Sequence, residues 1–144
     1  MYVIDRAAAA REIARVLRPS GHLVAAVWAG PEHADIVRLQ QIAGSFAPEP
    51  PVAGVGSGAM ADPSPFLSQL ADAGVDAPVE SAITEFAFDF ASAWAVLAGV
   101  TAARIEPERL EPARTAVRAA MWPDGDGPRG SRNKTQFIVG RRIA

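Results

Sequence analysis

The chain has 144 residues, no cysteine, two histidines and a formal charge of −2. Its length suits one domain or part of a larger one, and the missing cysteines exclude a disulfide framework, thiol catalysis and cysteine-ligated metal sites. The near-neutral charge argues against nucleic-acid binding, and no apolar run reaches the length of a membrane span.

The first predicted element is a helix over residues 7–17. Asp5 is placed to cap its first turn, and Pro19 with Gly21 ends it, the glycine because it can take a positive φ. The apolar run 23–28 follows and stops at a Gly-Pro turn. A short run without polar residues is typical of a strand buried on both faces of a parallel sheet, so we expect that burial here.

The next part of the chain predicts two helices separated by a loop. Residues 33–46 repeat apolar side chains at helical spacing, whereas residues 47–61 are rich in glycine and proline and indicate a loop. Asp62 and Pro63 have the residue types of an N-cap and a first helical position. Gly74 is placed to end the helix that they begin.

The remaining elements are a strand at 79–90, helices at 91–104 and 113–122, a loop at 123–130 and a last strand at 134–142. Phe86, Phe88 and Phe90 alternate, which predicts one apolar face for the first of these strands. Pro112 suits the first position of the second helix. We therefore expect an α/β fold with a small mixed sheet of about three strands, covered by helices.

The junction between the first helix and the first strand resembles a known family. Residues 12–24 read EIARVLRPSGHLV. They are similar to the turn before the fifth strand of class I S-adenosylmethionine-dependent methyltransferases, although Ser20 stands where that family usually has glycine. Residues 62–76 resemble the helix and turn before the sixth strand. Residues 134–142 resemble the last strand, which in this fold inserts antiparallel between strands six and five. The chain looks most like the small-molecule type related to ubiquinone and menaquinone biosynthesis.

The resemblance implies that residues 1–144 form a single truncated methyltransferase-like domain, the carboxyl half of the Rossmann-like family fold. The family holds S-adenosylmethionine on its first four strands, and residues 1–5 look like the segment that follows strand four. We therefore expect the cofactor-binding half and its motif to be absent. The run GVGSG at 54–58 does not replace that motif, because it follows prolines rather than a buried strand. Two lone histidines indicate no metal site.

Four residues are candidates for an acceptor pocket. Such pockets lie beyond the carboxyl ends of the parallel strands, where Trp28 ends one strand and His33 begins the next segment. His33 is also a candidate general base. Trp94 and Trp122 lie on the helical segments that resemble the family's lid over the acceptor. Ordinary packing stays open for the tryptophans, as does a solvent-exposed helix start for His33.

Two functions remain open at this point. The first is the substrate-side half of an S-adenosylmethionine-dependent small-molecule methyltransferase, inactive as an isolated chain. The second is a non-catalytic dimeric binding protein for a small apolar ligand. In either case strand 23–28 has a bare apolar edge, which is a template for pairing. We expect a cytoplasmic homodimer, or pairing with a complementing N-terminal half, without nucleic-acid or membrane partners.

Overall fold

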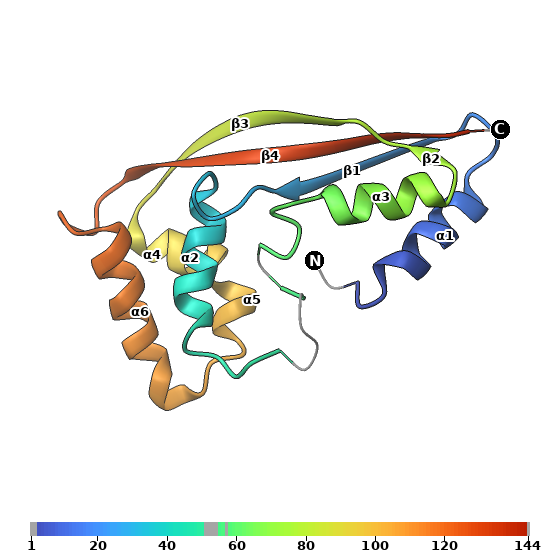
Figure 1. The fold of residues 1–144 in the computed structure, drawn as a ribbon. Coiled ribbons are helices and arrows are strands. Elements are labelled where there is room, and N and C mark those ends of the chain that lie inside the picture. The colour runs from blue at the N-terminus through green and yellow to red at the C-terminus, as the bar shows by residue number, and fades with distance from the viewer. Residues whose placement is uncertain (1–2, 51–54, 57, 144) are drawn as a thin grey trace.

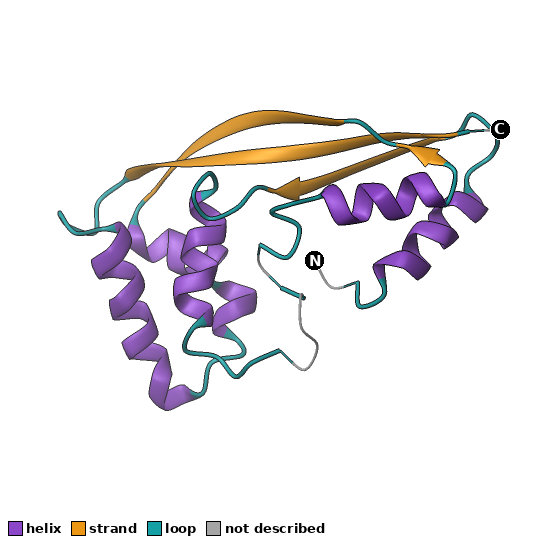
Figure 2. Cartoon of the chain, in the orientation of Figure 1, coloured by secondary structure: helices purple, strands orange, loops and turns teal. Residues whose placement is uncertain are grey.

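The computed structural model describes residues 3–50, 55–56 and 58–143, and it shows helices packed against one side of a twisted sheet (Figures 1 and 2). The elements in chain order are α1 (Arg6–Val16), β1 (His22–Trp28), α2 (Asp35–Gly44), α3 (Ser64–Asp72), β2 (Val75–Asp76), β3 (Val79–Phe88), α4 (Phe90–Leu97), α5 (Gly99–Ala102), α6 (Pro107–Met121) and β4 (Arg129–Arg142). The chain is therefore an α/β protein, as expected. None of the described helices combines the length and apolarity needed to cross a bilayer.

The last strand, β4, lies at the centre of the sheet (Figure 1). β1 pairs with β4 on one side, with Val24 opposite Val139. β2 and β3 both pair with β4, and Val79 lies opposite Ile138. All these pairings are antiparallel, so the insertion of the last strand between two earlier ones is confirmed. The described part of the chain forms four strands rather than about three, and it shows none of the parallel pairing expected of a mixed sheet.

The burial of β1 differs from the prediction. Leu23, Ala25 and Val27 point toward the helices, but Val24 is 71% exposed on the other face of the strand. The prediction of a strand buried on both faces is therefore wrong. The helices cover only one side of the sheet, and the apolar residues Val24 and Ala26 hide the alternation of burial in the sequence.

Two hydrophobic clusters support opposite ends of the sheet. One joins α1, α3, β2 and β4 around Leu70, Val75 and Ile138. The other joins α2, α4 and α6 around a core that includes Leu39 and Phe90. Along β4 the buried positions are Ile138 and Gly140 near the first cluster but the odd-numbered Ser131 and Asn133 near the second. A long strand with right-handed twist presents its two faces in turn to helices on one side, which accounts for this change.

The residues predicted to cap the start of α1 and the end of α3 are confirmed. Asp5 accepts a 2.8 Å hydrogen bond from the backbone N–H of Ala8 and so caps α1. Gly74 follows α3 with φ +83°. The start of α3 is displaced from the prediction, because Asp62 accepts a hydrogen bond from the N–H of Ser64 and the helix begins at Ser64. Hydrogen bonds from the Ser64 hydroxyl, and secondly from the Ser64 N–H, lower the pKa of the Asp62 carboxyl.

In the second half of the chain, the predicted boundaries of strands and helices differ from those in the structure. β3 ends at Phe88, and Phe90 is the buried first residue of α4, because the Asp89 side chain accepts from the N–H of Ser92 at 2.7 Å. That hydrogen bond also lowers the pKa of Asp89. The single helix expected at 91–104 is divided into α4 and α5 at Ala98.

The helix expected at 113–122 begins earlier, at Pro107. Both Pro107 and Pro112 are compatible with a helix start. The helix begins at Pro107, and Pro112 therefore lies inside α6. Similarly, β4 begins at Arg129 rather than at Lys134 because its pairing with β3 continues through the polar segment that composition indicated as a loop.

The backbone conformation of the turn between α1 and β1 leads to a prediction about stability. Ser20 has φ +62°, whereas Gly21, the residue expected to take a positive φ, does not. Ser20→Gly should raise the free energy of unfolding by up to about 1 kcal/mol, because a left-handed conformation is unfavourable for residues with a Cβ. Gly21→Ala should destabilise, since its Cβ would lie 2.7 Å from the carbonyl oxygen of Arg18. Urea unfolding midpoints test both, and a lower midpoint for Ser20→Gly contradicts the argument.

Candidate functional site

A polar pocket lies beyond the carboxyl end of β1. The chain leaves β1 along β4, with Ala29 N–H bonded to Lys134 O and Lys134 N–H bonded to His33 O, each at 2.9 Å. This local pairing brings His33 against β4 and close to β3. The pocket measures about 270 Å³ and is lined chiefly by Glu32, His33, Asp35, Ile83, Arg132 and Lys134.

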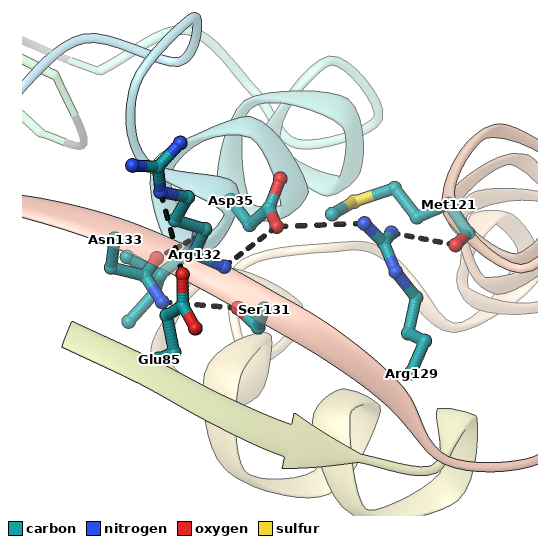
Figure 3. A network of polar contacts seen from close by, with 8 residues as sticks. Asp35, Glu85, Met121, Arg129, Ser131, Arg132 and Asn133 are labelled. Carbon is teal, nitrogen blue, oxygen red and sulfur yellow. Dashed lines mark hydrogen bonds and ion pairs between the residues drawn. The ribbon is translucent and has the colours of Figure 1, made fainter. Parts of the chain in front are cut away.

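A network of polar contacts fixes α2 beside this pocket (Figure 3). Asp35 accepts a 3.0 Å hydrogen bond from the backbone N–H of Arg132 and lies 3.5 Å from the Arg129 guanidinium. Asn133 accepts from the N–H of Ile36 at 2.8 Å. The residue that precedes α2, Ala34, has no side chain able to cap the helix, so Asn133 supplies this hydrogen bond from β4.

The same network extends to β3 and to the end of α6 (Figure 3). Asn133 also donates to the Ser131 hydroxyl at 3.0 Å. Arg129 donates to the carbonyl oxygen of Met121 at 2.6 Å, and Arg132 lies 3.5 Å from Glu85. Side chains from β4 therefore hold α2 and α6 in place, and the pocket has a fixed wall on that side.

The charged groups of the pocket are balanced in sign. Arg132 is paired with Glu85, whereas no ion pair to Lys134 is present within the described part of the chain. His33 Nε2 lies 4.0 Å from a carboxylate oxygen of Glu32, and both side chains are exposed. The Glu32 carboxylate covers the α-carbon of Gly30, where any Cβ would collide with it. Such an arrangement can hold a small polar group between an ammonium, an imidazole and a carboxylate.

The four candidate residues do not meet in one pocket. His33 lines the pocket just described, and Trp28 lies on the exposed face of β1 opposite Thr135. Trp94 and Trp122 both pack against Phe90 in the helical core, with ring centroids 6.5 and 5.6 Å from the Phe90 ring. This packing favours a structural role for Trp94 and Trp122.

Trp122 also borders a second hollow, of about 570 Å³, between α2 and the loop that follows α6. The Trp122 side chain is 6% exposed, and the Arg129 guanidinium lies 5.3 Å from its ring centroid. Arg129 already bonds Met121 and Asp35, so its contact with Trp122 belongs to the structural network.

Sequence reasoning missed Asp35 and Asn133 as residues of this region, and it favoured a solvated strand edge for Arg132 and Lys134 over contact with an anionic acceptor. Asp35 and Asn133 are far apart in sequence, and their approach depends on the pairing of β4 with both β1 and β3. The one available signal is the polar stretch before the apolar end of β4, which composition alone does not distinguish from a loop.

The described residues of the glycine run 54–58 do not show the strand–turn–helix setting of a cofactor-binding glycine turn. Of the run 54–58, residues 54 and 57 lie outside the described part, and Val55 and Gly56 belong to no strand. A Cβ at Gly58 would lie 2.9 Å from the Gln41 amide, so this glycine packs on α2 rather than opening a helix after a strand. Within residues 3–50, 55–56 and 58–143, no three histidine or acidic side chains gather as a metal site.

The sequence matches no protein-family model, and no curated protein matches it.

Proposed function

We propose that this chain is the acceptor-side half of a class I S-adenosylmethionine-dependent small-molecule methyltransferase, inactive until a cofactor-binding half completes it. The observation that carries the proposal is the antiparallel insertion of β4 between β1 and the β2–β3 edge. This order agrees with the fifth, last and sixth strands of the family that residues 12–24 resemble.

The free edge of β1 supports the same proposal. β1 pairs only with β4 among the described strands. A cavity of about 170 Å³ is lined by apolar side chains of α1, β1 and α3, together with Val3, Met60 and Arg6. A strand added to β1 would satisfy the open backbone groups, and a helix attached to that strand would cover the cavity. We assign this edge to the complementing half.

The pocket at the carboxyl end of β1 supplies the acceptor side of the proposed site. His33, Glu32 and Lys134 provide polar contacts there, and Ile83 provides an apolar wall. Methyl transfer requires mainly that the acceptor be oriented and shielded from water, so a few such contacts suffice. Because the resemblance places the cofactor motif on the complementing half, no catalytic step is assigned to this chain alone.

Thermal unfolding with S-adenosylhomocysteine tests the proposal. The isolated chain should show no rise in melting temperature at millimolar ligand, because a ligand that does not bind the folded state cannot stabilise it. The chain should co-purify with the polypeptide encoded directly upstream of Met1, and that complex should gain several degrees. Replacing the glycines of the upstream strand–turn with valine should abolish the gain while the complex persists.

Two results would contradict this proposal. One is a ligand-dependent rise in melting temperature for the isolated chain. The other is an upstream sequence without a strand followed by a glycine-rich turn.

The second candidate is a non-catalytic protein that binds a small apolar ligand. The apolar cavity beneath β1 favours it. That cavity is lined in part by β1, whose free edge we assign to the complementing half, so the co-purification experiment separates the two functions. A chain that recruits no upstream partner and ignores the cofactor supports the binding protein.

A further inference from the structure

The charged side chains around the pocket at the carboxyl end of β1 pair off in a way that leaves Lys134 alone. The Asp35 carboxylate accepts from the Arg132 N–H and lies 3.5 Å from the Arg129 guanidinium, so its charge is already compensated (Figure 3). The Arg132 guanidinium lies 3.5 Å from Glu85. The Lys134 ammonium, in contrast, has neither an ion pair nor a hydrogen bond to any part of the chain that the structure describes.

The remaining carboxylate of the pocket, that of Glu32, does not compensate Lys134. It lies over the α-carbon of Gly30, where any Cβ would collide with it, and 4.0 Å from His33 Nε2. No ion pair joins Glu32 to Lys134, although both line the pocket and both are described. Lys134 is half-buried, so its ammonium is partly withdrawn from water without an acidic partner. An anionic ligand would supply the missing partner.

An apolar side chain stands directly beside this ammonium. Ile83 lies opposite Lys134 in the register of β3 and β4, and it lines the same pocket. Directly opposite side chains of an antiparallel pair share one face of the sheet, with Cβ atoms about 4.5–5.5 Å apart. Ile83 is 51% exposed, so its side chain is available for contact. A ligand whose charged end binds the ammonium would lay its apolar body on Ile83.

We propose that this pocket binds the carboxylate of a small organic acid through the Lys134 ammonium. One ammonium without an acidic partner matches a monoanion, whereas a dianion such as a phosphate monoester would bring a second negative charge near Glu32. An apolar cavity of about 150 Å³ holds one benzene ring, so a pocket of about 270 Å³ has room for one ring with its substituents. The inference rests on the proposed function only in naming this acid as the methyl acceptor.

Titration of the whole chain with benzoate, and with benzamide as its neutral counterpart, tests the site. Because Lys134 is the only lysine of the chain, labelling with ¹³C-lysine makes every labelled NMR signal that of Lys134. Benzoate should shift the Cε signal saturably and bind at least about tenfold more tightly than benzamide, because only the carboxylate forms a charge-assisted hydrogen bond. Added salt should weaken the binding of benzoate alone. Hexanoate and hexanamide repeat the comparison with an unbranched apolar body.

Substitutions of Lys134 assign the preference to one side chain. Lys134→Met should bind benzoate and benzamide equally, as read from the backbone amide signals of His33 and Ile83, whereas Lys134→Arg keeps the charge and should keep the preference. Arg141→Met is the matched control, because it removes one positive charge from the exposed far end of the same strand. It should leave the preference unchanged. If Lys134→Met lowers the melting temperature, the ratio of acid to amide binding in the unmodified chain decides.

Three results would overturn the inference: equal binding of acid and amide by the unmodified chain, no saturable Cε shift with either acid at tens of millimolar, or the same loss in Arg141→Met as in Lys134→Met. The titration uses neither the cofactor nor the upstream polypeptide, so its failure is distinct from failure of the proposed function. A chain that binds benzoate through Lys134 but recruits no upstream half keeps this site and loses the methyltransferase role. A complex stabilised by S-adenosylhomocysteine but without preference for the acids has the opposite meaning.

Discussion

Replacing Ile138 by alanine is expected to lower the free energy of unfolding by about 2–5 kcal/mol. Ile138 is fully buried in the central strand, opposite Ala25 of β1 and Val79 of β3. Its side chain belongs to the cluster that joins β4 to α1 and α3. Truncation therefore removes apolar contacts and leaves a cavity at the point where the sheet meets its helical layer.

Urea unfolding at one fixed protein concentration measures this effect, because association with a second copy would make the midpoint depend on concentration. Ile138→Val should cost only about 0.5–1.5 kcal/mol, since it removes a single methylene. Val24→Thr keeps a β-branched side chain at an exposed position of the neighbouring strand and should change stability by less than about 0.5 kcal/mol. A loss below about 1 kcal/mol for Ile138→Ala would show that this cluster does not depend on β4.

The features that could be predicted from the sequence are those set by local chemistry or by the family resemblance. Asp5 caps α1 because its carboxylate reaches the N–H of Ala8, three residues away. Gly74 takes a positive φ because the end of α3 requires one. The central position of β4 depends on long-range pairing, and only the resemblance predicted it.

Other features depend on what packs against a segment. β1 is as apolar as a strand buried on both faces, yet Val24 is exposed because no described element covers that face. Pro112 lies within α6 because Pro107 had already supplied a start signal. Ser20, rather than Gly21, takes the left-handed conformation. Ser20 stands at the position that is usually glycine in the family that residues 12–24 resemble.

The candidate site could be predicted only in part for a similar reason. His33 was identifiable because it follows β1 closely, but Lys134 and Arg132 join it through strand pairing about 100 residues away. Trp94 and Trp122 have the residue type of a ligand pocket, yet their contacts with Phe90 place them in the helical core. Residue type alone does not separate these two environments.

Asn133→Ala is expected to lower the free energy of unfolding by about 1–3 kcal/mol. Asn133 is 2% exposed, and its side chain accepts from the N–H of Ile36 and donates to Ser131. Alanine leaves that N–H without a partner at the start of α2, where Ala34 offers none. Hydrogen exchange at the Ile36 amide should therefore accelerate more than exchange in the middle of α2.

Arg132→Ala is the matched control at the adjacent position. Its guanidinium is largely exposed, and the hydrogen bond that it donates to Asp35 comes from the backbone and survives the substitution. The lost surface ion pair with Glu85 should cost no more than about 1 kcal/mol, with no change in exchange at Ile36. Equal effects of the two variants on Ile36 exchange would show that the strand as a whole, rather than the Asn133 amide, holds α2. A selective effect of Asn133→Ala would instead show that one buried side chain couples the helical layer to β4, the strand that carries Lys134 of the pocket.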